Sequence, residues 1–132
     1  MTIFEDVKKL NLPIGQYAVV GSGVMSAYGI RPHHDVDLIV TKNLFVILKN
    51  SGWQSVPNRN GVLKSGNYEV DADYKYREYQ PDHDELIRNA EIIEGVPFIR
   101  LSELIKFKTA LGRDKDKKDI ELIEQYLIKQ KI

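Results

Sequence analysis

The sequence predicts an α/β protein in which helices flank one mixed β-sheet and the C-terminus is helical. Two apolar runs typical of buried strands, residues 17–20 and 36–40, lie on either side of a short helical segment. A later segment places apolar side chains at helical spacing near the end of the chain. Strands and helices that mix in this way pack in layers around one sheet. The apolar side chains of the last segment are Ile120, Ile123, Tyr126 and Leu127.

Three helices are expected in the first half of the chain. Apolar residues at helical spacing predict a helix over residues 3–10. A short helix over residues 24–30 must end before Pro32, because the residue before a proline disfavours helical geometry. Residues 43–51 carry an apolar helical face. Caps and stops of the later helices are expected at Asp82, Ser102, Gly112 and either Asp114 or Asp116.

The other strands are expected between these helices. Residues 53–56 and 62–64 have strand character and are separated by a turn over residues 57–61. A longer strand follows over residues 68–74, and residues 91–100 predict a hairpin.

Length and composition limit the classes of protein that the chain can represent. With 132 residues we expect a single domain over residues 1–132. Lys plus Arg and Asp plus Glu number 19 each, so no net charge attracts nucleic acid or an anionic membrane. The absence of cysteine excludes disulfides, thiolate metal sites and cysteine nucleophiles. No apolar run has the length of a membrane span, so we expect a cytoplasmic protein without a membrane partner.

The segment most informative about chemistry begins at the end of the first strand. Gly21 and Ser22 follow that strand and lead into a short helix, where free backbone N–H groups favour an anion such as a phosphate. The next strand opens with Asp35 and Asp37, whose side chains fall on the same face because strand residues alternate. Two carboxylates held close repel each other unless a cation lies between them. The pair is therefore a candidate site for Mg²⁺, which binds hard oxygen ligands and shares them with substrate phosphates.

A second group of acidic residues lies in the strand expected over residues 68–74. Alternation places Glu69, Asp71 and Asp73 on one face of this strand. If the strand pairs beside the one that carries Asp35 and Asp37, one of the three acids completes a metal site. We favour Asp71, which could also act as a general base toward a hydroxyl nucleophile. The pattern leaves Glu69 and Asp73 open as alternatives.

These features together resemble the nucleotidyltransferase superfamily, which includes DNA polymerase beta and the aminoglycoside nucleotidyltransferases. The resemblance rests on Gly-Ser at positions 21–22, twelve intervening residues, Asp-Val-Asp at 35–37 and an acidic residue in a later strand. The segments 101–108 and 112–119 look like the corresponding part of minimal bacterial nucleotidyltransferases of the toxin and abortive-infection type. The fold expected from the resemblance is thus the nucleotidyltransferase fold.

The resemblance implies an enzyme that moves a nucleoside monophosphate from an NTP such as ATP to an acceptor hydroxyl. It implies two Mg²⁺ ions held by Asp35, Asp37 and Asp71, which stabilise the attacking and leaving oxygens. Gly21, Ser22, Lys108, Arg113 and Lys115 would bind the nucleotide. A protein, a tRNA end and a small molecule are all open as the acceptor.

The sequence also admits other interpretations. A catalytically silent module of the same fold, binding a nucleotide or a protein partner as in a toxin–antitoxin pair, is the main alternative, and a homodimer or partner chain could supply acceptor recognition. Residues 21–26 also fit part of a dinucleotide-binding fingerprint, but the helix is too short and the acids arrive too early. His33 and His34 are expected in a solvated turn. Either Lys106 or Lys108 could face the pocket. The aromatic residues expected in the core or on the strand surface are Trp53 and the tyrosines at 74, 76 and 79.

Overall fold

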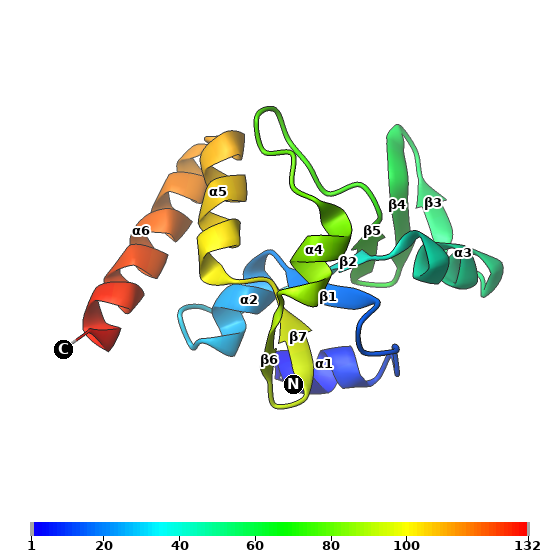
Figure 1. Cartoon of the computed structure of the whole chain (residues 1–132), viewed down its shortest axis with the longest axis horizontal. Helices are drawn as coiled ribbons and strands as arrows, with labels where there is room; N and C mark the ends of the chain where they lie inside the picture. Colours follow the sequence, from blue (N-terminus) through cyan, green and yellow to red (C-terminus); the bar gives the residue numbers. More distant parts are fainter. Residues whose placement is uncertain (1, 132) are drawn as a thin grey trace.

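A computed structural model describes residues 2–131 and shows a seven-stranded mixed sheet flanked by helices, with a helical C-terminus (Figure 1). This confirms the fold class that the sequence predicts. The strand order is β3-β4-β5-β2-β1-β7-β6. The helices are α1 (Ile3–Lys8), α2 (Ser22–Ala27), α3 (Lys42–Asn50), α4 (His83–Arg88), α5 (Leu101–Leu111) and α6 (Asp114–Gln130). The strands are β1 (Tyr17–Val20), β2 (Val36–Val40), β3 (Gln54–Val56), β4 (Arg59–Ser65), β5 (Tyr68–Asp71), β6 (Glu91–Ile93) and β7 (Val96–Phe98).

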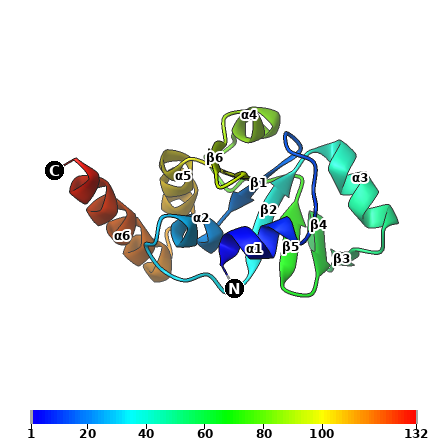
Figure 2. The same cartoon turned by 90° about the horizontal axis from the view of Figure 1, so that it is seen from below.

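The helices are distributed around both faces and both ends of the sheet. Helices α1 and α2 lie together on one face, and α4 lies on the other (Figure 2). Helices α5 and α6 pack against each other at one end of the molecule, and α3 lies at the opposite end near β3 and β4 (Figures 1 and 2). None of the helices in residues 2–131 combines the length and apolar character that crossing a bilayer requires.

The centre of the sheet is formed by the two strands that the sequence predicts best. β1 and β2 are antiparallel, with Val20 opposite Asp37, because the short helix α2 returns the chain directly to the neighbouring position. β5 then pairs with β2 in parallel, with Glu69 opposite Asp37. The acidic start of β2 is therefore flanked by the end of β1 on one side and by the acidic strand β5 on the other.

The core fills the space between this sheet and its helices. Its fully buried side chains include Val19 and Leu38 from the strands and Met25 and Leu104 from the helices. In α6 only Ile123 of the predicted apolar stripe is fully buried, whereas Leu127 is 36% exposed. Tyr126 packs edge-on against Tyr28 with ring centroids 5.5 Å apart, so within the stripe it is Leu127 that faces outward.

Several boundaries differ from those predicted. β5 ends at Asp71 and not at residue 74: Ala72 N–H still bonds the carbonyl of Gly61 in β4, and beyond it Asp73 N–H bonds the Asp71 side chain. The turn expected over residues 57–61 is tighter, because β4 already begins at Arg59. Ser102 is not a cap: α5 begins at Leu101 and no side chain caps it. Asp82, by contrast, caps α4 by accepting a hydrogen bond from Glu85 N–H, as predicted.

The prediction for His33 was wrong. Its imidazole is only 8% exposed, with Nε2 2.8 Å from the Asp6 carboxylate and Nδ1 3.0 Å from the Ser26 hydroxyl. The ring therefore connects α1 with α2 and the loop before β2. A pairing partner so far away in the sequence leaves no local signal, which is why the turn was expected to be solvated.

Candidate functional site

A cleft of about 370 Å³ lies where the acidic start of β2 faces the junction of α5 and α6. One wall is acidic and comes from the sheet, and the other is aromatic and aliphatic and comes largely from α5 and the segment after β5. Two arginines, Arg59 and Arg113, also line the cleft. The residues that line the cleft are Val20, Gly21, Asp35, Asp37, Leu38, Arg59, Glu69, Asp71, Tyr74, Phe107, Leu111 and Arg113.

The acidic wall is assembled by strand pairing. The parallel register of β2 and β5 places Glu69 directly opposite Asp37, and Asp71 opposite Ile39, two positions further along. Asp35 immediately precedes β2 and is exposed. The structure thus brings the three aspartates favoured from the sequence into one cleft, together with Glu69. Asp73 does not line it: Asp73 lies beyond the end of β5, where its N–H donates to Asp71 Oδ1 at 2.7 Å.

Crowding and burial of these acids favour the protonated form of the central one. Burial raises the pKa of Asp37 to about 6, and the charges of Glu69 and Asp35 add to the effect. Burial likewise raises the pKa of Asp71, against which the hydrogen bond from Asp73 N–H acts. Glu69 is engaged by Arg59, with which it forms a salt bridge. Negative charge is therefore concentrated around Asp37 beyond what the arginine balances.

The donor set has the chemistry that Mg²⁺ requires. Hard carboxylate oxygens that repel each other gain most from a divalent cation, and Mg²⁺ is usually bound by one or two carboxylates, several waters and substrate phosphates. Within residues 2–131 no group of three His, Asp or Glu side chains is arranged to hold a metal ion by itself. The residues present therefore fit an ion that is shared with a substrate, with Asp35 and Asp37 as its protein ligands.

Gly21 allows the chain to pass close to Asp37. Its backbone has φ 66° and ψ −147°, a conformation that is essentially restricted to glycine. A Cβ at this position would lie 3.0 Å from Asp37 Oδ2. Ser22 is the first residue of α2 and follows directly. Both sequence-predicted residues therefore lie at the acidic end of the cleft, and the first of them lines it.

Arg113 is held at the rim of the cleft by Asp116. Its Nε donates to Asp116 Oδ2 at 2.6 Å and its Nη2 to Oδ1 at 3.1 Å, a two-pronged pair at the start of α6. Asp116 is fully buried, and its pKa is lowered because the hydrogen bonds and charge of Arg113 outweigh the burial that would raise it. The arginine is thus fixed by a buried anion, and one Nη group carries no bond to that anion.

The two predicted lysines lie elsewhere. Lys108 is buried between α5 and α6, with Nζ 2.8 Å from Asp119 and 3.7 Å from Asp116. Asp119 also accepts two hydrogen bonds from Arg31, at 2.8 and 2.9 Å. Lys115 is exposed on the first turn of α6 and is not among the residues that line the cleft. Of the predicted cations, the structure places only Arg113 beside the acids.

Sequence reasoning missed three residues of the cleft. Arg59 was expected in a turn, and the early start of β4 brings it beside Glu69. Tyr74 and Phe107 stack with ring centroids 4.2 Å apart and form part of the aromatic wall. No local pattern signals a contact between the segment after β5 and α5.

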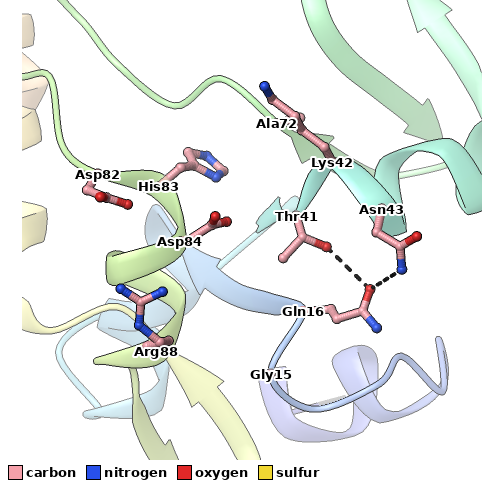
Figure 3. A pocket seen from close by; sticks show the side chains of 10 residues that line it. All are labelled: Gly15, Gln16, Thr41, Lys42, Asn43, Ala72, Asp82, His83, Asp84 and Arg88. Atoms are coloured by element: carbon pink, nitrogen blue, oxygen red, sulfur yellow. Dashed lines mark hydrogen bonds between the residues drawn. The ribbon is translucent and has the colours of Figure 1, made fainter.

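A larger hollow, of about 720 Å³, lies beyond the carboxyl end of β2 (Figure 3). Its side chains include two bases, Lys42 and Arg88, and the acids Asp82 and Asp84, so no single charge prevails. Gln16 Oε1 accepts hydrogen bonds from the Thr41 hydroxyl at 3.3 Å and the Asn43 amide at 3.1 Å (Figure 3). These polar groups already satisfy one another, and the hollow has no counterpart of the acidic cluster. The cleft is therefore the stronger candidate for chemistry.

Comparisons with known proteins give one likeness of fold. No protein-family model matches the sequence, and no curated protein matches it. The crystal structure of ANT(2″)-Ia in complex with adenylyl-2″-tobramycin is similar, with a TM-score of 0.49 and 18% identity, covering 98% of this chain and 86% of that chain. The likeness concerns the path of the chain and says nothing about which groups this chain binds.

Proposed function

We propose that this chain is a Mg²⁺-dependent nucleotidyltransferase, a single domain that moves a nucleoside monophosphate from an NTP to an acceptor hydroxyl. The observation that carries the proposal is the convergence of Asp35, Asp37 and Asp71 on Gly21 and Arg113 in one cleft. An acidic group that attracts divalent metal and a cation that attracts phosphate then lie on either side of the same space.

The carboxylates have separate tasks in this proposal. Asp35 and Asp37 hold the metal, and Asp71 contributes a third oxygen ligand. Bound Mg²⁺ would neutralise the charge on the attacking and leaving oxygens of the phosphoryl transfer. Asp71 Oδ1 is engaged by Asp73 N–H, which orients the carboxylate and leaves Oδ2 to accept the proton of the acceptor hydroxyl. Burial raises the pKa of Asp71, which makes it a stronger base than an exposed aspartate.

The triphosphate is held by backbone and guanidinium groups. Gly21 and Ser22 offer N–H groups and a hydroxyl close to the metal ligands, where a side chain at position 21 would be obstructed by Asp37. Arg113 binds a phosphate with the Nη group that does not bond Asp116. Lys115 adds positive charge at the start of α6. Lys108 supports the nucleotide indirectly, because its ammonium lies near the same Asp116 that fixes Arg113.

The acceptor is a protein, a tRNA end or a small molecule with a free hydroxyl. In this proposal a homodimer or a partner chain completes acceptor recognition. A role in a toxin–antitoxin pair fits such a partner.

One observation favours an alternative in which the chain binds a nucleotide or a protein partner without catalysis. Glu69 is neutralised by Arg59, and no three acidic or histidine side chains within residues 2–131 form a ready metal site. A silent module would keep the cleft and its phosphate contacts and would not depend on metal.

Calorimetric titration with ATP, GTP, CTP and UTP, each with and without Mg²⁺, tests the proposal. We expect the unaltered chain to bind at least one NTP in the presence of Mg²⁺ and the Asp35→Asn/Asp37→Asn variant to lose this binding. Glu121→Gln/Glu124→Gln is the matched control, since it removes two exposed carboxylates on α6. Binding that ignores both metal and the aspartate substitutions would favour the silent module, and transfer of label from an α-³²P-NTP to an acceptor would exclude it.

A further inference from the structure

Tyr74 lines the cleft and carries a buried hydroxyl that lacks a hydrogen-bond partner within residues 2–131. It is 6% exposed and lies in the segment that follows β5. Its ring stacks on Phe107 and meets the edge of Tyr79 with centroids 6.1 Å apart. Packing thus holds the ring firmly, while the hydroxyl group contributes nothing to the protein's own bonding.

Other tyrosines of this chain show the usual arrangement. The Tyr79 hydroxyl donates to Glu103 Oε1 at 3.1 Å, and the Tyr68 hydroxyl donates to the carbonyl of Asp6 at 2.7 Å. A buried hydroxyl without a partner loses its hydration and gains no bond in return, so most buried polar groups are paired. A phenylalanine at position 74 would make the same ring contacts without that cost. We therefore expect the hydroxyl of Tyr74 to bond a molecule from outside the chain.

The position of Tyr74 indicates the kind of partner. It lines the cleft together with Asp37, Asp71 and Arg113, the groups assigned above to metal and phosphate. Burial raises the pKa of Tyr74 well above that of free tyrosine, and the charges of Tyr79, Asp37 and Asp71 act in the same direction. The phenol is therefore protonated at neutral pH and can donate to an oxygen acceptor.

We propose that the Tyr74 hydroxyl is a substrate-binding group that donates a hydrogen bond to an oxygen of the bound nucleoside triphosphate. This inference rests on the proposed function, and it adds a contact from the aromatic wall to those from the acidic wall. The stacked Phe107 fixes the ring, so little side-chain entropy is lost on binding, and the nucleotide must uncover the buried hydroxyl as it binds.

Two substitutions that each remove one hydroxyl distinguish this role from a structural one. Tyr74→Phe deletes the unpaired hydroxyl, and Tyr79→Phe deletes the neighbouring hydroxyl that is paired with Glu103. We expect Tyr74→Phe to keep or raise the thermal unfolding midpoint and to weaken Mg²⁺-NTP binding by about three- to tenfold, the usual size of one lost hydrogen bond. We expect Tyr79→Phe to lower the midpoint by about 2 to 6 °C and to leave the affinity within about twofold.

The measurements are calorimetric binding of ATP, GTP, CTP and UTP with Mg²⁺ and thermal unfolding of the free protein. Unchanged affinity in Tyr74→Phe would overturn the inference, and so would a loss of affinity that is matched by a lower unfolding midpoint, because the hydroxyl would then have a structural partner. Failure of the unaltered chain to bind any of the four nucleotides would instead contradict the proposed function itself. Comparison of ATP with 2′-deoxy-ATP and 3′-deoxy-ATP then identifies the oxygen: the analogue that lacks the acceptor binds both proteins equally, and a difference that persists with both analogues assigns the acceptor to the phosphates or the ribose ring oxygen.

Discussion

The ammonium group of Lys108 lies 2.8 Å from the carboxylate of Asp119, buried between the two C-terminal helices. A lysine that the sequence associates with the nucleotide therefore serves first to hold α5 against α6. Its charge is shared with Asp116, 3.7 Å away. Both carboxylates have lowered pKa values, because their bonds to Lys108 and to the arginines outweigh the effect of burial.

Lys108→Met should lower the free energy of unfolding by about 2 kcal/mol, since it removes a charged hydrogen bond to the buried Asp119 and leaves that carboxylate with Arg31 alone. Lys106→Met is the control: Lys106 is exposed and pairs with Glu103 on the same helix, so its loss should cost less than about 0.5 kcal/mol. Urea unfolding followed by circular dichroism measures both. Equal effects of the two substitutions would show that the Lys108 pair contributes no more than a surface pair.

Gly21→Ala should destabilise the protein by about 1 to 3 kcal/mol and abolish nucleotide binding, because it combines a strained backbone with a Cβ 3.0 Å from Asp37 Oδ2. Gly29→Ala separates the two causes. Gly29 also has a positive φ, of 70°, but a Cβ there meets nothing within 4 Å. We expect a smaller loss of stability and no loss of binding from Gly29→Ala. If both variants bound nucleotide equally well, the close passage of Gly21 past Asp37 would have no part in the site.

Stability in EDTA should fall as the pH rises through 6, owing to Asp37. Its pKa rises from 3.8 to about 6 on folding, so the native state binds the proton more tightly. The stabilisation is complete below pH 3.8 and is lost as the pH passes 6, and at about 1.4 kcal/mol per pKa unit it amounts to about 3 kcal/mol. Unfolding of the unaltered chain and of Asp37→Asn across pH 4 to 8 measures it.

Asp37→Asn should lack this part of the pH dependence and become the more stable of the two above pH 6. The exposed Glu121→Gln serves as the control and should follow the unaltered chain. A constant difference between Asp37→Asn and the unaltered chain at every pH would show that the Asp37 carboxyl titrates as in the unfolded state.

Arg113→Gln should weaken Mg²⁺-NTP binding by at least about tenfold and leave binding of the nucleoside alone unchanged, because the guanidinium contacts phosphate in the proposed complex. Arg77→Gln removes another exposed arginine, one that lies over the Tyr76 ring, and should leave both affinities unchanged. Calorimetry with ATP and adenosine separates the two ligands. An equal loss for ATP and adenosine would place Arg113 away from the phosphates.

The sequence predicted those parts of the molecule whose signals are local. β2 agrees with its predicted bounds because four of its five residues are apolar, and alternation brings Asp35 and Asp37 to one place. Gly112 ends α5 in a left-handed conformation, as its lack of a side chain suggests. Assignment of metal-binding and catalytic roles to Asp35, Asp37 and Asp71 stays a prediction.

The parts that the sequence could not predict depend on contacts between distant segments. The pairing of β5 with β4 stops after Ala72, where Asp73 N–H bonds the Asp71 side chain, although the pattern of residues 68–74 does not change there. The place of Tyr74 in the cleft follows from its stacking on Phe107, which belongs to another element. Such contacts follow from the assembled sheet, so they become visible only with the structure.

Arg31 lies four residues before Asp35 in the sequence, and its guanidinium donates two hydrogen bonds to Asp119 on α6. This ion pair joins the segment before Asp35 and Asp37 to the helix pair α5 and α6. At this end the walls cannot separate unless a partly buried ion pair breaks. The width of the cleft at this end therefore depends on an ion pair between two residues that are 88 positions apart in the sequence.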